Sequence, residues 1–241
     1  MAELGTVTRA LLGMVRDGDD ERALAGRICR ACVDGLDVDG AAISLFTAHD
    51  SRQTLWATDA VAELLEELQF ALGQGACMEA ATTGRPVLVA DVHRPADTVR
   101  WPIFAAAVVD QTPVRALFAL PLQWGAVNLG VLDLYRATPG GLSDPQWRDA
   151  RGAVDTAALM ILGLRTDPDA GVDGAGGWLD HTTGHRAEIH QATGMVLAQL
   201  GIGPTDALAR LRGHAFAHQR PLIDVARDVV ARRMVFTEDM I

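Results

Sequence analysis

The last quarter of the chain is organised around the run His190-Gln191-Ala192-Thr193-Gly194-Met195-Val196. Apolar side chains recur there every three or four residues, which predicts an amphipathic helix that ends at Gly201, because glycine readily adopts a left-handed stop. Two more stripes of the same period follow, one after Pro204 and one after Pro221. Helices are therefore predicted at about 186–200, 204–218 and 221–230. Stripes of this length must pack on one another or on a partner subunit.

The same quarter resembles an ANTAR domain in the order and spacing of its signature residues. These are Arg186, Ile189, Ala192, Gly194 and Met195, then Ala207, Leu211, Arg212 and Ala215, then Arg220, Leu222, Val225, Ala226 and Val229. ANTAR domains are three-helix RNA-binding modules whose members act in transcription antitermination by binding paired hairpins in leader RNA. The resemblance therefore implies an RNA partner. Many members have Ala-Lys-Gly where this chain has Ala192-Thr193-Gly194, which removes one possible phosphate contact.

The resemblance implies that the RNA-contacting residues lie on this module. They are Arg186, Thr193, Gly194, Arg212, His218, Arg220 and Arg227. A glycine inside a helix costs up to about 1 kcal/mol relative to alanine, so Gly194 is expected mainly to let another backbone or helix approach closely. The arginines lie on polar helix faces, where Arg220 can pair with Asp224 at i,i+4.

The charge of the module does not by itself favour nucleic acid. From Trp178 onward, 7 arginines balance 7 carboxylates, and the remainder of the chain carries the whole net charge of −10. A neutral module is expected to bind RNA weakly unless its arginines cluster on one face. An alternative therefore stays open, in which the three helices bind a partner protein. A DNA-binding helix-turn-helix is less favoured, because no helix is strongly basic.

The residues before this module alternate between helical and strand patterns. Their order is helix, two strands, helix, strand, helix, two strands, helix, which predicts an α+β domain around an antiparallel sheet with helices on its faces. One predicted helix, at about 60–72, is capped by Asp59 and carries an apolar stripe. Its acidic residues Glu63, Glu66 and Glu67 are expected on the opposite, solvated side.

This region resembles a GAF domain over about residues 7–164. The resemblance rests on the runs Leu72-Gly73-Gln74-Gly75-Ala76-Cys77, Arg85-Pro86-Val87 and Leu129-Gly130-Val131-Leu132-Asp133-Leu134-Tyr135. GAF domains are sensor modules that bind cyclic nucleotides, haem, bilin or other small molecules, or that only dimerise. A GAF domain followed by an ANTAR domain is an arrangement found in one-component regulators. The two resemblances together imply a transcription antitermination regulator.

The ligand pocket of GAF domains lies between the sheet and the helices near the middle of the sequence. Here it corresponds to Leu68, Leu72, Cys77, Trp101, Phe104 and Phe118. The same side chains would fill an ordinary core, so a filled or small apolar pocket is favoured, no cofactor or metal is predicted, and an unknown small-molecule ligand is left open. Cys77 has no adjacent histidine for bilin attachment, and a lone loop histidine such as His93 does not indicate haem.

The last helix of this region, after Ser143-Asp144-Pro145, carries two registers of a seven-residue repeat. The registers are Trp147, Val154 and Ile161, and Ala150, Ala157 and Leu164. Such a seam predicts a homodimer through residues 147–164, although the stripe could instead pack on the domain's own sheet. The predicted organisation is a sensor domain at 1–165, a flexible linker rich in glycine and acids at 166–180, and the three-helix domain at 181–241.

The remaining signals concern compartment and chemistry. The N-terminus has no secretory pattern, and no apolar run reaches the roughly 18 residues that span a bilayer, so a cytoplasmic location is expected. Cys29 and Cys32 have CxxC spacing but lie in a helical pattern without a second ligand pair, so a packing role is predicted. No nucleophile, base and orienting acid are grouped in a motif, so the chain is not predicted to be an enzyme.

Overall fold

The computed structural model describes residues 4–14, 20–46, 52–125, 127–166 and 184–237. The chain divides into two compact units, residues 1–170 and 171–241. The linker predicted at 166–180 lies, beyond residue 166, outside the described residues.

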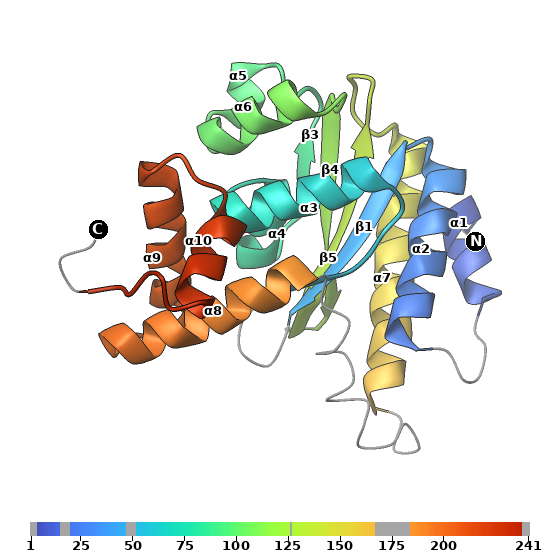
Figure 1. Ribbon diagram of the computed structural model, residues 1–241. Coiled ribbons are helices and arrows are strands. Elements are labelled where there is room, and N and C mark those ends of the chain that lie inside the picture. The colour runs from blue at the N-terminus through green and yellow to red at the C-terminus, as the bar shows by residue number, and fades with distance from the viewer. Residues whose placement is uncertain (1–3, 15–19, 47–51, 126, 167–183, 238–241) are drawn as a thin grey trace. The chain divides into compact units, whose positions relative to one another are not determined.

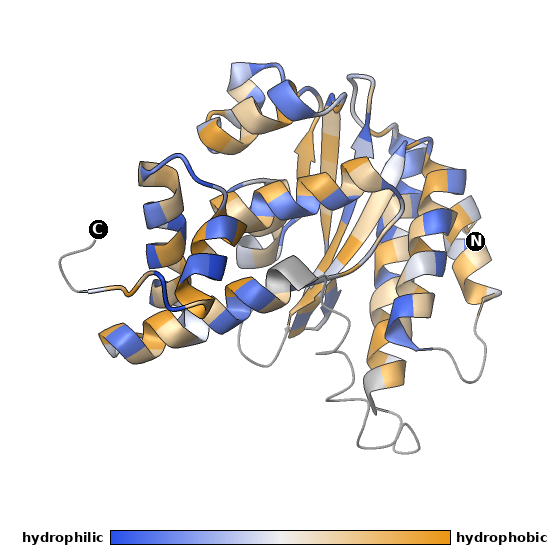
Figure 2. Cartoon of the chain, viewed as in Figure 1, coloured by the Kyte–Doolittle hydropathy of each residue, from blue (hydrophilic) through white to orange (hydrophobic). Residues whose placement is uncertain are grey.

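The first unit is an α+β domain around a five-stranded antiparallel sheet, as predicted (Figure 1). The strands follow the order β2-β1-β5-β4-β3. Their bounds are β1 (Gly40–Phe46), β2 (Arg52–Ala57), β3 (Val87–Val89), β4 (Ala116–Trp124) and β5 (Val127–Arg136). The three inner strands are buried along most of their length, and strands β3 and β4 are largely hydrophobic (Figure 2).

Helices cover both faces of this sheet (Figure 1). On one face α2 packs on β1 and β2, α7 packs on β4, and α1 packs on α2 and α7. On the other face α3 and α4 contact the sheet, and α6 packs on α3. The bounds are α1 (Thr6–Leu12), α2 (Glu21–Leu36), α3 (Ala60–Leu72), α4 (Ala76–Thr83), α5 (Pro95–Thr98), α6 (Pro102–Gln111) and α7 (Asp144–Thr166).

Asp59 caps α3, as predicted. One of its carboxylate oxygens accepts the backbone N–H groups of Val61 and Ala62, both at 2.9 Å. The Tyr135 hydroxyl donates to the same oxygen at 3.0 Å. Because Tyr135 lies on β5, this contact fixes the start of α3 to the middle of the sheet and sets the position of the side chains along it.

The apolar seam of α7 packs inside the first unit. Ala150, Ala157 and Ile161 are fully buried, and they share a core with residues of α1, α2 and β4. The alanines let the neighbouring elements approach closely. These residues therefore follow the alternative, in which the stripe packs on the domain's own elements, and a homodimer through residues 147–164 stays a prediction.

The second unit is a three-helix domain formed by α8 (Gly184–Leu200), α9 (Pro204–Ala217) and α10 (Leu222–Val230). All three pairs of helices are in contact. The core consists of the predicted stripes together with an aromatic residue from the C-terminal segment: Ile189, Ala192, Val196, Ala207, Leu211, Ala215, Leu222, Val225, Ala226, Val229 and Phe236.

Two further findings concern the described residues as a whole. None of the helices there combines the length and the apolar character that crossing a membrane requires. The cysteines Cys29, Cys32 and Cys77 are all buried and unbridged.

Candidate functional site

The exposed face of α8 carries three small residues and one glutamine. Ala187, Gln191, Gly194 and Ala198 lie three or four residues apart and are all exposed. We call these four residues the α8 strip. A Cβ atom placed on Gly194 would meet nothing within 4 Å among the described residues. None of the described helices therefore makes the expected close approach to Gly194.

Thr193, the residue before Gly194, lies on the buried side of α8. It is buried, and its hydroxyl donates to the Ile189 carbonyl at 2.7 Å within the same helix. Its side chain therefore belongs to the core of the domain and is not displayed to an RNA. The position where many ANTAR domains have lysine is thus a packing position in this chain.

Two of the predicted RNA-binding arginines are held in ion pairs. Arg220 Nη2 lies 2.6 Å from Asp228 Oδ2, so the expected partner Asp224 is wrong. Arg227 Nε lies 2.8 Å from Glu188 on α8, and its Nη1 lies 3.7 Å from Asp224. Asp224 is a local partner three residues before Arg227, whereas Glu188 comes from another helix and could not be predicted from spacing along α10.

His218 stacks on His214 at the end of α9. Their ring centroids are 4.0 Å apart, and a ring nitrogen of His218 lies 2.9 Å from the His214 carbonyl. His218 is exposed, whereas His214 is buried against Phe236. Burial, together with the charges of His218 and Arg220, lowers the pKa of His214 below its ordinary value.

The remaining basic groups extend the candidate surface. Arg212 is half-buried on α9, and the side chain of Arg186 is not among those that the structure describes. Sequence reasoning did not select Arg232 and Arg233, which follow α10 and are exposed. Arg233 pairs with Asp228 at 2.8 Å. Over residues 187–237 the sequence has six arginines and four carboxylates, so this part of the domain has a small positive excess.

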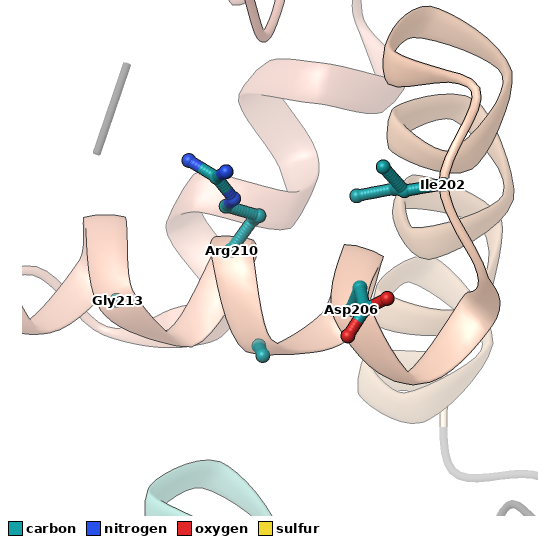
Figure 3. Close-up of a pocket in the computed structure, with 5 residues that line it drawn as sticks. Ile202, Asp206, Arg210 and Gly213 are labelled. Atoms are coloured by element: carbon teal, nitrogen blue, oxygen red, sulfur yellow. The ribbon is translucent and has the colours of Figure 1, made fainter. Parts of the chain in front are cut away.

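The outer side of α9 carries an open hollow of about 430 Å³ (Figure 3). Its lining consists of Ile202, Asp206, Ala209, Arg210 and Gly213. The charged groups are one carboxylate and one guanidinium, a turn apart on the same helix. Phe216, further along α9, has an exposed fraction of 65%. This side of α9 thus carries charged, small and apolar residues, and the apolar side chain of Phe216 is exposed to solvent.

Five of the six residues predicted to line a sensor pocket lie on one side of the sheet. Cys77, Trp101 and Phe104 are buried in one cluster, and Leu68 and Leu72 pack against it. Trp101 and Phe104 meet edge to face with ring centroids 6.4 Å apart. The choice of Phe118 is wrong, because its side chain is buried in the core on the other face. Its neighbours Leu117 and Ala119 on β4 face the predicted side, since strand side chains alternate.

A cluster of buried polar groups lies on that same side, and the sequence analysis missed it. Glu66 was expected in solvent but has an exposed fraction of only 1%. Arg52 is also buried; its guanidinium donates to Cys77 Sγ and lies 3.5 Å from Glu66 Oε2. Asp133 on β5 completes the group, and its Oδ2 atom is buried without a hydrogen-bond partner among the described residues. We call Arg52, Glu66, Cys77 and Asp133 the buried polar cluster.

The environment of the cluster disfavours negative charge on two of its members. Burial raises the pKa of Asp133, and the nearby Glu66 raises it further. Burial also raises the pKa of the Cys77 thiol, against the lowering effect of Arg52.

A second set of hydrogen bonds supports the cluster. The Gln69 side chain accepts from the Cys77 backbone N–H at 2.7 Å, and its amide nitrogen lies 3.4 Å from Glu66 Oε1. The hydroxyls of Ser44 and Thr54 donate to Glu66 Oε2, the second at 3.0 Å. Groups from β1, β2 and α3 thus hold the Glu66 carboxylate in one place, and Gln69 links it to the start of α4.

Comparisons with known proteins agree with this architecture. The family model for the GAF domain matches residues 18–162, and that for the ANTAR domain matches residues 179–230. The comparison with curated proteins gives no match.

Similar solved structures show the fold of the first unit. The GAF domain of an Acinetobacter phosphoenolpyruvate-protein phosphotransferase is 10% identical, with 66% of this chain and 92% of that chain covered and a TM-score of 0.51. A GAF domain/HD domain protein from Geobacter sulfurreducens is 12% identical, with 64% and 99% covered and a TM-score of 0.50. At these identities the likeness concerns the fold alone. From the family matches, the chain belongs to the GAF domain family and carries an ANTAR domain after its GAF domain.

Proposed function

We propose that this protein is a one-component regulator of transcription antitermination, in which the GAF sensor domain controls an ANTAR domain that binds paired hairpins in leader RNA. The order of the two matched domains and the RNA binding of the ANTAR family support this proposal. Binding would stabilise an antiterminator hairpin, so that the terminator hairpin does not form. The chain would then act as a regulator on nascent transcripts in the cytoplasm and not as an enzyme.

The observation that carries the RNA-binding part is the open α8 strip. A glycine in mid-helix destabilises the helix by roughly 0.5–1 kcal/mol relative to alanine, and none of the described residues packs on Gly194 in a way that would explain it. A flat strip with a glycine at its centre allows an RNA backbone or an unstacked loop base to approach the helix closely. We therefore place the RNA contact on this face of α8.

The arginines supply the electrostatic part of the contact. Arg227 lies beside α8, because it pairs with Glu188. Exposed ion pairs of this kind are weak, so RNA phosphates can compete for the guanidinium groups. Guanidinium planes can also stack on splayed loop bases, which suits hairpin loops. The proposed RNA-contacting residues are Arg186, Gly194, Arg212, His218, Arg220 and Arg227, with Thr193 acting only through packing.

Regulation by the GAF domain requires two states that differ in free energy. A signal that binds one GAF state more tightly shifts the population toward it. The proposed consequence is a change in the exposure or pairing of the ANTAR domain.

The test is binding of the full-length protein to a labelled RNA with two adjacent short hairpins, at several salt concentrations. Scrambled-loop RNA and duplex DNA are the competitors. Loop-specific binding that weakens on Arg212→Ala, but not on Arg148→Ala in the exposed part of α7, supports the proposal. Equal and weak binding to all three nucleic acids contradicts it.

One observation favours a second candidate function, binding of a partner protein. Phe216 is large, apolar and 65% exposed on α9, and aromatic residues are enriched at protein interfaces. In that case Phe216→Ser would abolish partner capture and leave nucleic-acid binding weak and unspecific. Loop-specific RNA binding that survives Phe216→Ser would favour the antitermination proposal.

A further inference from the structure

Three side chains of the buried polar cluster present metal-binding atoms to one point. A carboxylate oxygen of Glu66, the Cys77 sulfur and a carboxylate oxygen of Asp133 all lie within 4.8 Å of one another. They come from α3, α4 and β5, so the fold and not a local sequence motif brings them together. Glu66 and Cys77 are almost completely inaccessible to solvent. Solvent water therefore does not screen the charges of Glu66 and Cys77.

The cluster is short of positive charge. Among the described residues, the two carboxyl groups and one thiol of the cluster contact one guanidinium, that of Arg52. Ionised groups are costly to bury unless they are paired or bind a metal. Asp133 is half-buried, and its Oδ2 atom is buried without a hydrogen-bond partner among the described residues. With all groups ionised, the cluster has a net charge of −2, which one divalent cation would neutralise.

We propose that Glu66, Cys77 and Asp133 bind one divalent transition-metal ion of the zinc or ferrous-iron class. The thiolate selects such ions over magnesium and calcium, which prefer oxygen ligands alone. In a tetrahedral site, neighbouring oxygen and sulfur ligands are separated by about 3.4–3.6 Å. The three ligand atoms lie within 4.8 Å of one another, so small rotations about the χ angles can bring them to these separations.

The surrounding hydrogen bonds suit such a site. Ser44, Thr54 and Gln69 orient the Glu66 carboxylate, and Gln69 also holds the start of α4 that carries Cys77. Such supporting contacts orient metal ligands and tune their affinity. Arg52 would remain as a donor to the thiolate. Three protein ligands leave a fourth position open to water or a small molecule. This proposal concerns the GAF domain alone and does not depend on RNA binding.

The test uses cobalt(II) as a spectroscopic probe on the full-length protein after treatment with a chelator. The expected result is binding of one Co²⁺ per chain with a thiolate-to-cobalt charge-transfer band. Cys77→Ser removes this band. Glu66→Gln and Asp133→Asn preserve side-chain volume and weaken Co²⁺ binding at least about 10-fold, the smallest loss expected even from changes to supporting residues. Zinc raises the unfolding temperature of the wild type, and this rise is lost in Asp133→Asn.

The matched control is Cys29→Ala with Cys32→Ala, which removes two buried cysteines from the core on the other face of the sheet. These changes leave the cobalt band intact if the site is built by Cys77. Circular dichroism confirms that each variant is folded, and Asp133→Asn alone decides the matter if Cys77→Ser does not fold. The proposal is overturned if the wild type binds no stoichiometric Co²⁺, if folded Cys77→Ser keeps the band, or if folded Asp133→Asn binds Co²⁺ as tightly as the wild type.

Discussion

Arg227 Nε lies 2.8 Å from Glu188 Oε2, and this contact ties α10 to the early part of α8. Both side chains are more than a third exposed, so water screens the pair, and it contributes at most about 1 kcal/mol to stability. The pair therefore holds the arginine beside the α8 strip without binding it tightly. An RNA phosphate can replace the carboxylate at small cost.

Substitutions of the two partners of this pair distinguish a role of Arg227 in RNA binding from a role in stability. Arg227→Ala removes a phosphate-binding cation, so we expect RNA affinity to fall about 10-fold and the salt dependence of binding to decrease by about one unit of slope. Glu188→Ala breaks the same pair but frees the arginine, so RNA affinity should stay the same or rise. Fluorescence anisotropy across a salt series measures both quantities. Equal losses in the two variants would assign Arg227 a structural role only.

The stability of the ANTAR domain should depend on pH through His214. Burial lowers the pKa of this histidine in the folded state, so below the ordinary value near 6.5 the unfolded chain binds a proton that the folded chain does not. Stability therefore falls as pH decreases from about 6.5 toward the lowered pKa, and is fully present above that range. Hydrogen exchange of peptides from α9, corrected for intrinsic rates, should show less protection at acidic pH.

His214→Leu should remove most of this dependence, because no proton can then bind at that position. His93→Gln, in an exposed loop of the GAF domain, serves as the control and should leave it unchanged. If the stability of His214→Leu depends on pH as strongly as that of the wild type, another group is responsible.

The packing of α7 on α1 depends on Asp149. Its two carboxylate oxygens accept the backbone N–H groups of Val7 and Thr8 at 2.9 and 3.0 Å, and the Thr8 hydroxyl also donates to it. Asp149→Ala leaves these buried donors without an acceptor, so we expect a loss of about 2–4 kcal/mol in the free energy of unfolding. Urea unfolding followed by tryptophan fluorescence measures the loss. Asp155→Ala, at an exposed position of the same helix, should change it by less than about 0.5 kcal/mol.

The local signals in the sequence predicted the elements well. The Asp59 cap, the left-handed stop at Gly201 and the prolines before the last two helices act over a few residues, and the observed helices begin or end there. The two domain families were also identified correctly, because their signature residues are short runs within these elements.

The burial of Glu66 could not be predicted in the same way. The sequence predicted an apolar face of α3 formed by Val61, Leu64, Leu65, Leu68 and Leu72. Leu65 is buried as predicted, but the other buried residues of α3 lie beside that face: Ala62, Glu66, Gln69 and Phe70. This shift is possible because the partners of Glu66 come from elsewhere in the chain: Ser44, Arg52 and Thr54. Spacing along one helix carries no information on such long-range partners.

The error at Phe118 has a different cause. The inner strands are apolar on both faces, since helices cover both sides of the sheet. The period of two then fixes which residues share a face but not which face contains the pocket. The same reasoning applies to α7, whose seven-residue repeat fits a partner helix or the domain's own sheet equally well.

In the proposed RNA contact, Gly194 lacks a side chain so that RNA can approach α8. Gly194→Ala tests this role. The structure leaves room for the added methyl group, so the variant should raise the free energy of unfolding by up to about 1 kcal/mol while RNA affinity falls about 10-fold, or 1.4 kcal/mol. Gly163→Ala, at an open and exposed position of α7, is the control and should leave RNA affinity unchanged. A stabilised Gly194→Ala protein that binds hairpin RNA as tightly as the wild type would contradict the account.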